Sequence, residues 1–301
     1  MTSPALDRRG LWMAAGAFVL WGVMPLYWHL LASVPALQIV LHRVVWGALL
    51  VAGWLFWQRG RGWLRQTLAR PRVAAMLAAS GCLIAFNWGL YIWAVNSGHV
   101  IETSLGYFIN PLLNVLIGVA VLRERLNRVQ AVSVAIAAAG VLWLTFNYGS
   151  FPWIALSLAA SFALYGLIRR QAAVDAIPGL GVESLFLLPA ALVGLAWLEA
   201  RGQGGFFGHW PLSVDALLVA GGALTALPLI GFAYGVRRIP FTLVGLLQYI
   251  APTLQLLIGV FFFGEPFGSD RAIGFAIIWA ALALFAADGL ARARRRTAKA
   301  G

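Results

Sequence analysis

Long apolar runs, separated by short polar or basic stretches, follow one another along the whole chain. A helix that crosses a bilayer needs about 20 predominantly apolar residues. By this criterion the sequence predicts ten spans, at residues 10–31, 36–57, 73–95, 101–122, 128–146, 151–168, 179–199, 213–234, 240–263 and 270–289. We therefore expect an all-α integral membrane protein with ten transmembrane helices.

One span-length segment occurs twice. Residues 105–126 match residues 246–267 at a shift of 141, with nine identical positions that include a proline, a glycine and a closing glutamate. A proline inside a helix lacks the backbone N–H and clashes with the preceding turn, so Pro111 and Pro252 are predicted helix breaks. Paired, proline-interrupted spans at matching positions of two halves are typical of the central site of a transporter.

The duplication divides the chain into two repeats, residues 1–147 and residues 148–301, the second ending in a basic tail. Each repeat contains five predicted spans. Because this number is odd, the second copy enters the membrane upside down, which predicts two inverted five-helix repeats.

The composition agrees with a membrane protein, because 61% of the residues are hydrophobic, only 11% are charged and the mean hydropathy is +0.84. A soluble domain carries about 25% charged residues. The excess of twelve positive charges lies mainly at the ends of apolar runs, so it indicates membrane topology rather than nucleic-acid binding. With ten spans nearly all arginines fall on one side, and the positive-inside rule places both termini in the cytoplasm.

Two of the predicted spans carry a polar stripe. Six residues of span 101–122 fall within about 140° of one another on a helix, namely Glu102, Thr103, Gly106, Tyr107, Asn110 and Asn114. Span 240–263 repeats the stripe less strongly with Gln248, Pro252 and Gln255, flanked by Tyr249. We interpret these stripes as the lining of a cavity, and hydrogen bonding between helices is the alternative.

Aromatic and polar residues share a line in three further spans, at Trp21, at Asn87, Trp88 and Tyr91, and at Tyr165. Aromatic rings near amides can hold the apolar body of an organic solute while the amides bind its polar groups. We therefore expect the first, third, fourth, sixth, eighth and ninth spans to line the site. Tryptophans nearer the span ends are predicted to form a membrane-interface belt, namely Trp28, Trp63 and Trp210.

His42 and Arg43 lie about two turns inside the second span. An arginine at this depth needs an anionic or carbonyl partner, and Glu102, Glu183 or an anionic substrate are candidates. A purely structural lock explains Arg43 equally well. Histidine titrates near neutral pH, so a proton is a further candidate partner through His42. Acidic residues at span ends are predicted helix caps, namely Glu124, Glu265 and Asp288.

The sequence contains no GxSxG, HExxH or Walker motif and no Cys/His cluster, so we expect no enzyme activity, metal or cofactor. Two alternatives stay open. One is a membrane-embedded transferase or hydrolase that uses His42, Arg43 and Glu102. The other is a passive channel.

Several motifs together resemble the RarD group of EamA-type permeases, in the drug/metabolite transporter superfamily. They are His42-Arg-Val-Val-Trp46, Asn87-Trp88, Ser104-Leu-Gly-Tyr-Phe-Ile-Asn-Pro-Leu112, Tyr165-Gly-Leu-Ile-Arg169 and Gln248-Tyr-Ile-Ala-Pro252. The resemblance covers about residues 8–290. It implies two EamA repeats in the bacterial inner membrane, cytoplasmic termini and export of a small metabolite. Neither the substrate nor the oligomeric state follows from it.

Overall fold

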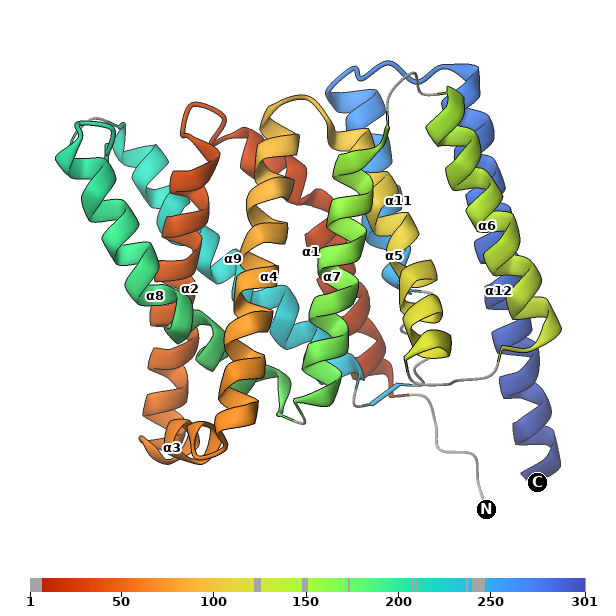
Figure 1. Cartoon of the computed structure of the whole chain (residues 1–301), viewed down its shortest axis with the longest axis horizontal. Helices are drawn as coiled ribbons and strands as arrows, with labels where there is room; N and C mark the ends of the chain where they lie inside the picture. The colour runs from red at the N-terminus through yellow and green to blue at the C-terminus, as the bar shows by residue number, and fades with distance from the viewer. Residues whose placement is uncertain are drawn as a thin grey trace. The chain divides into compact units, whose positions relative to one another are not determined.

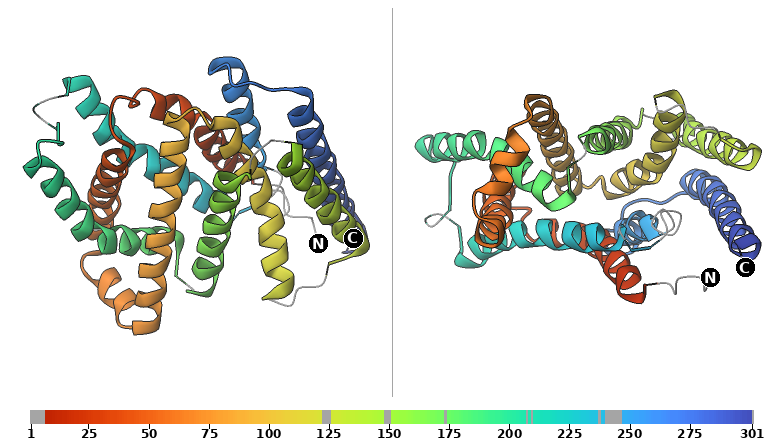
Figure 2. Two further views of the ribbon diagram at one scale, coloured as in Figure 1. Left: turned by 45° about the horizontal axis from the view of Figure 1, so that its top comes forward. Right: turned by 90° about the horizontal axis from the view of Figure 1, so that it is seen from below.

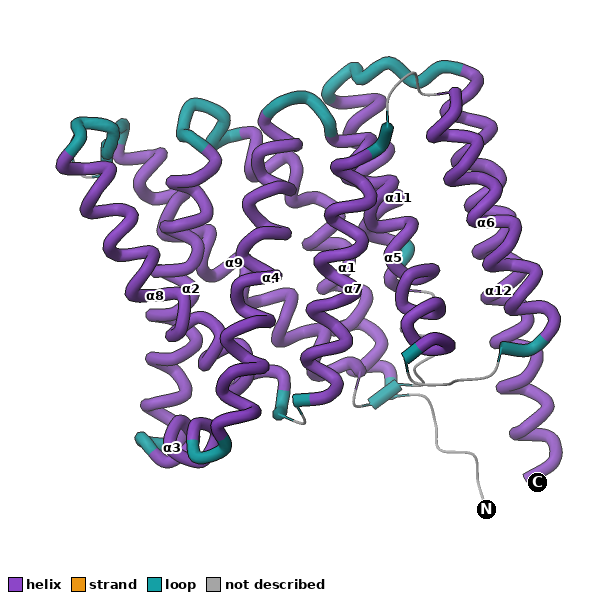
Figure 3. The backbone as a smooth tube through the Cα atoms, viewed as in Figure 1, coloured by secondary structure: helices purple, strands orange, loops and turns teal. Residues whose placement is uncertain are grey.

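The computed structural model describes residues 7–121, 126–147, 151–172, 174–206, 208, 210–236, 238–239 and 247–300. The side chains of Pro111 and Asn114, and residues 122–125 with Glu124, lie outside the described part. In the described residues the regular structure is helical throughout (Figure 3). The helices, shown in Figure 1, are α1 Arg8–His29, α2 Ala36–Arg59, α3 Gly62–Leu68, α4 Pro71–Asn96, α5 Val100–Ala120, α6 Arg128–Asn147, α7 Trp153–Gln171, α8 Ala176–Ala200, α9 Leu212–Val236, α11 Ile250–Leu257 with the π-helix η1 Ile258–Phe262, and α12 Ser269–Ala300.

A helix occupies the described part of each of the ten predicted spans, which confirms the all-helical prediction. Among the described residues, six helices are long and apolar enough to cross a membrane, and three shorter apolar helices accompany them. The short helix α3 was not predicted. It begins just after Gly60, whose φ of 60° ends α2 in a conformation that favours glycine.

The two predicted prolines behave differently. Helix α5 is continuous through position 111, so Pro111 does not interrupt it. Near Pro252 the helix is interrupted, but at the turn residue Tyr249. Pro252 itself lies in the first turn of α11. A first-turn proline costs little because its missing N–H has no partner within the helix.

By internal contacts the chain forms two compact units. Unit 1 comprises residues 1–23, 99–160 and 234–301, and unit 2 comprises residues 24–98 and 161–233. Each unit therefore takes helices from both halves of the chain, and α1, α7 and α9 each contribute to both units.

In unit 1, α6 and α12 form a close antiparallel-type pair along their length, as the two views of Figure 2 show. Small residues allow the approach: a Cβ on Gly274 would lie 2.3 Å from Leu144, and one on Gly140 would lie 2.9 Å from Ile278. The indole N–H of Trp143 donates to the carbonyl of Asp270 at 3.1 Å.

The cap prediction for Asp288 is wrong because α12 continues past the predicted end at residue 289. Asp288 lies inside the helix. Its carboxylate accepts from the Asn127 amide at 2.9 Å, which joins α12 to the start of α6, and pairs with Arg292 at 2.9 Å.

Glu265 does cap a helix, although not its own. Its two carboxylate oxygens accept the backbone N–H groups of Val100 and Ile101, at 2.6 and 2.8 Å, at the start of α5. The first N–H groups of a helix have no partner within it, and a carboxylate also interacts favourably with the helix dipole. Burial raises the pKa of the Glu265 carboxyl, while the two N–H groups and the charges of His99 and Arg271 oppose the rise.

We expect Glu265→Ala to lower the free energy of unfolding by about 1–2 kcal/mol, the usual effect of losing a helix cap. Glu265→Gln keeps one acceptor oxygen and should lose about half as much. Thermal unfolding in detergent measures the effect, with Glu199→Ala, an exposed glutamate at the end of α8, as the control. Equal midpoints for Glu265→Ala and the control would show that the cap adds no stability.

In unit 2, α8 packs against α2, α3 and α4. The indole of Trp63 on α3 is buried in this core with Leu55, Leu77, Leu180 and Val182. Trp28 is also buried, almost completely. The prediction that Trp28 and Trp63 form an interface belt is therefore wrong, because both rings fill the protein interior.

Candidate functional site

The most unusual buried side chain of unit 2 is Arg43, which is only 8% exposed. It is in the eighth position of α2, about 10 Å from the start of the helix at 1.5 Å per residue. Apart from His42, the residues from Ile39 to Gly47 around it are apolar, so the helix carries this charge into the protein rather than to an end.

The Arg43 guanidinium lies between two indole rings. Its central carbon is 4.0 Å from the ring centroid of Trp88 on α4 and 5.0 Å from that of Trp28 on α1. Its Nε donates to the hydroxyl oxygen of Thr225 on α9 at 2.7 Å, and Thr225 donates to the carbonyl of Gly221 at 2.8 Å. Stacking on aromatic faces stabilises a planar, weakly hydrated guanidinium where water is excluded.

Thr225 is a partner of Arg43 that the sequence did not indicate. The sequence pointed to Glu102, Glu183, helix carbonyls of the first half or an anionic substrate, and Thr225 adds a neutral hydroxyl from the second half of the chain. The only sequence signal for Thr225 is a lone hydroxyl residue within an apolar run.

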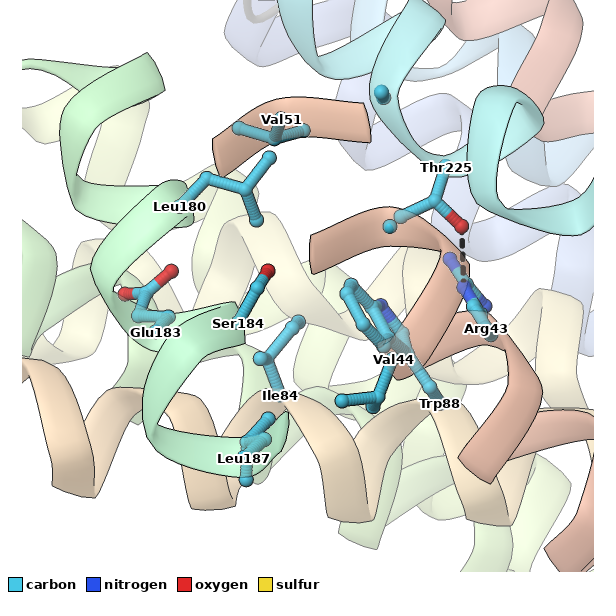
Figure 4. A pocket seen from close by; sticks show the side chains of 12 residues that line it. Arg43, Val44, Val51, Ile84, Trp88, Leu180, Glu183, Ser184, Leu187 and Thr225 are labelled. Atoms are coloured by element: carbon cyan, nitrogen blue, oxygen red, sulfur yellow. Dashed lines mark hydrogen bonds between the residues drawn. The ribbon is translucent and has the colours of Figure 1, made fainter. Parts of the chain in front are cut away.

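Arg43 lines a small cavity of about 10 Å³, room for about one water molecule. Figure 4 shows Arg43 and Glu183 on opposite sides of the lining. The lining residues are Arg43, Val44, Gly47, Val51, Ile84, Trp88, Leu180, Glu183, Ser184, Leu187, Thr225 and Ala226. They come from α2, α4, α8 and α9. The second span, from which His42 and Arg43 were expected at the site, and the seventh span, which was not expected to line it, supply most of this wall.

Glu183 on α8 is 1% exposed and has three partners in unit 2. The Ser80 hydroxyl on α4 lies 2.5 Å from Oε1, the Tyr165 hydroxyl on α7 lies 3.5 Å from Oε2, and Arg169 Nε lies 3.5 Å from Oε1. Tyr165, a predicted site residue, therefore faces a carboxylate, and Glu183 pairs with Arg169.

The other predicted residues of unit 2 are buried near the same helices. The Asn87 amide on α4 donates to the Ser161 hydroxyl on α7 at 2.9 Å. Tyr91 is buried one turn further along α4. The buried ring of His42 lies 4.6 Å from the ring of Phe206, centroid to centroid.

Unit 1 holds the remaining predicted residues, and Asn110 is the most informative. Its side chain on α5 is 0% exposed, and neither its amide nitrogen nor its amide oxygen has a hydrogen-bond partner in the described part of the chain. Tyr107 and Gln248 are half-buried. The ring of Tyr249 stacks on Phe108 at 6.4 Å, and the Gln255 amide donates to the carbonyl of Trp21 at 3.2 Å.

Glu102 acts as a helix cap. Its Oε1 accepts the N–H of Ile154 at the start of α7 at 3.2 Å, and its Oε2 lies 4.0 Å from Nδ1 of His99. This cap gives the Glu102 carboxylate a structural role. The enzyme alternative instead requires Glu102 to take part in a reaction. In the described residues, no group of three or more His, Cys, Asp or Glu side chains could hold a metal ion.

Comparisons with known proteins agree with a transporter. The model of the EamA-like transporter family matches residues 8–146. An uncharacterized transporter of Pseudomonas aeruginosa is 45% identical over 96% of this chain and 96% of its own length. Protein RarD of Escherichia coli is 42% identical, covering 97% of this chain and 98% of that protein. A solved structure titled only "Crystal structure of protein" shares the fold, with a TM-score of 0.59 and 23% identity over 91% of this chain and 96% of that chain.

Proposed function

Because the chain belongs to the RarD group of the EamA-like transporter family, we propose that it is a secondary transporter that exports a small organic metabolite across the bacterial inner membrane. The chain is a multi-pass membrane protein, as its apolar helices and its family indicate. In this proposal ten spans form two inverted repeats, residues 1–147 and 148–301, and one helix bundle rocks about a fixed midplane site.

The observation that carries the proposal is the buried guanidinium of Arg43 beside a cavity. A charged arginine deep in a membrane costs about 2.5–3.5 kcal/mol or more. Such residues are rare and usually mark a substrate or ion pathway. Here the charge stands among aromatic and hydroxyl side chains, a mixture that suits an organic solute with both an apolar body and a polar group.

Flux into proteoliposomes against a panel of labelled metabolites, with and without a pH gradient, tests the proposal. We expect saturable uptake of at least one compound and counterflow, in which unlabelled solute inside drives entry of labelled solute. Unsaturable flux without counterflow would favour the channel alternative. No flux for any compound across a broad panel would contradict the transporter.

We expect both termini to lie in the cytoplasm, because the arginine clusters alternate with ten spans. Reporter fusions placed after Lys299 and within residues 202–209 should report opposite sides of the membrane. Cysteine labelling at the same two places checks the topology without attaching a reporter domain to the protein. The same side for both positions would contradict the inverted repeats.

A further inference from the structure

We propose that Glu183, Ser80 and Arg169 form a proton-binding site within unit 2, and that Glu183 carries the proton that drives transport. The inference rests on the proposed transporter function.

The Ser80 Oγ lies near two acceptors at once. It is 2.5 Å from Oε1 of Glu183 and 3.0 Å from the backbone carbonyl of Leu77. A serine hydroxyl has one proton to donate and two lone pairs to accept with. If Glu183 is ionised, Ser80 can satisfy only one of these two acceptors.

A proton on Glu183 satisfies both contacts. The carboxylic acid then donates to Ser80 Oγ, and Ser80 donates to Leu77, so every short contact holds one hydrogen. The Leu77 carbonyl keeps its helical partner, the N–H of Gly81, in either case, so the protonated form gains one hydrogen bond. It also removes the charge from a carboxyl group that is 1% exposed, and a buried charge costs more than a buried, hydrogen-bonded neutral acid. No bond other than O–H changes, and the proton comes from water and returns to water.

The ionised form of Glu183 also has a charged partner, the guanidinium of Arg169. Arg169 Nε lies 3.5 Å from Oε1, and the Arg169 guanidinium is held by the carbonyl of Asp175 at 3.3 Å. Gly179, one turn before Glu183 on α8, provides the room: a Cβ there would lie 1.7 Å from the guanidinium. The site therefore fits both forms of the carboxyl group, as a proton carrier requires.

Within the residues that the structure describes, few other charged or titratable groups face Glu183. On α7 they are Arg169 and the hydroxyl of Tyr165. Helix α2 presents Arg43 across the shared cavity, while His42 on α2 lies against Phe206. Helix α3 carries Arg65, which is exposed, and α4 has no acidic or basic residue after Arg72. Glu183 and Arg43 line one cavity. A change in the charge of Glu183 therefore changes the electrostatic potential at the place where we propose that the substrate binds.

Infrared difference spectra of the protein in lipid, between mildly acidic and mildly alkaline buffer, test proton binding directly. Wild type should show the carbonyl band of a protonated carboxyl group, and Glu183→Gln should lose that band. Glu199→Gln, at the exposed end of the same helix, is the matched control and should keep it. Ser80→Ala removes the hydroxyl that contacts both Glu183 and Leu77, and it should shift the band. Gly179→Ala should displace the Arg169 guanidinium and raise the pH at which the band disappears.

Flux supplies the second readout. In proteoliposomes Glu183→Gln should keep counterflow but lose all stimulation by a pH gradient, whereas Glu199→Gln should keep both. An unchanged band in Glu183→Gln, or unchanged gradient stimulation, would overturn the proposal. If Glu183→Gln does not fold, Ser80→Ala and Gly179→Ala decide: no shift in either refutes the site. A band lost in Glu183→Gln with no flux in wild type would refute the transporter alone.

Discussion

Arg43→Gln is expected to reduce metabolite flux per folded protein by about 10- to 100-fold. A hydrogen bond to a charged group contributes about 1.5–3 kcal/mol, and each 1.4 kcal/mol corresponds to a factor of ten. Glutamine can still bond to the Thr225 hydroxyl, but it loses the charge that lies between Trp28 and Trp88. Flux is measured in proteoliposomes with the amount of folded protein determined for each variant.

Two further variants distinguish a role of Arg43 in transport from a structural role. Arg43→Lys keeps the charge but loses the planar group that stacks on two rings, so an intermediate flux is expected. Arg65→Gln removes an exposed arginine of α3 and should leave flux unchanged. If Arg43→Gln lowers folded yield while the surviving molecules transport normally, Arg43 is a structural lock and the site assignment is wrong.

Asn110→Leu is expected to abolish flux without lowering the thermal unfolding midpoint. The Asn110 amide is fully buried, and its two polar atoms have no partner in the residues that the structure describes. An unsatisfied buried polar group destabilises by about 1–3 kcal/mol, so an apolar residue of similar shape should be neutral or stabilising. A residue kept at such a cost suits a bound solute or water that completes its hydrogen bonds in another state.

The conservative variant Asn110→Asp and the neighbouring Ile109→Val separate function from packing. Ile109 is buried on the same helix, so Ile109→Val should lower the midpoint slightly and leave flux intact. Asn110→Asp puts a charge at the same place and should lower the midpoint strongly. Normal flux in Asn110→Leu would show that this amide plays no part in transport.

The helices could be predicted from the sequence because hydrophobic length alone defines a span. The exceptions have local causes. Helix α3 is shorter than any span, and its Trp63 is held by tertiary packing that a window of residues cannot show. The break near Pro252 falls at Tyr249, because a proline is most easily accommodated in the first turn of the helix that follows.

The candidate site was predicted less well. Arg43, Trp88 and Tyr165 stood out as polar or aromatic residues inside apolar runs, and the structure places each in a buried cluster. Thr225 did not stand out, since a single hydroxyl in a span is ordinary, and Trp28 was predicted to lie at the membrane interface. Their roles come from contacts between helices that are distant in sequence, which periodicity does not encode. That Asn110 and Gln248 face one midplane cavity stays a prediction.

The division of unit 1 across both halves of the chain bears on how the protein is made. Helix α6 ends at Asn147, and its close partner α12 begins only at Ser269, about 120 residues later. At a synthesis rate of about 5–20 residues per second, α6 spends roughly ten seconds in the membrane before that partner exists. During this interval Gly140 and its neighbours face lipid or another protein. Unit 2 ends at residue 233, so it can assemble while the ribosome is still translating the last helices of unit 1.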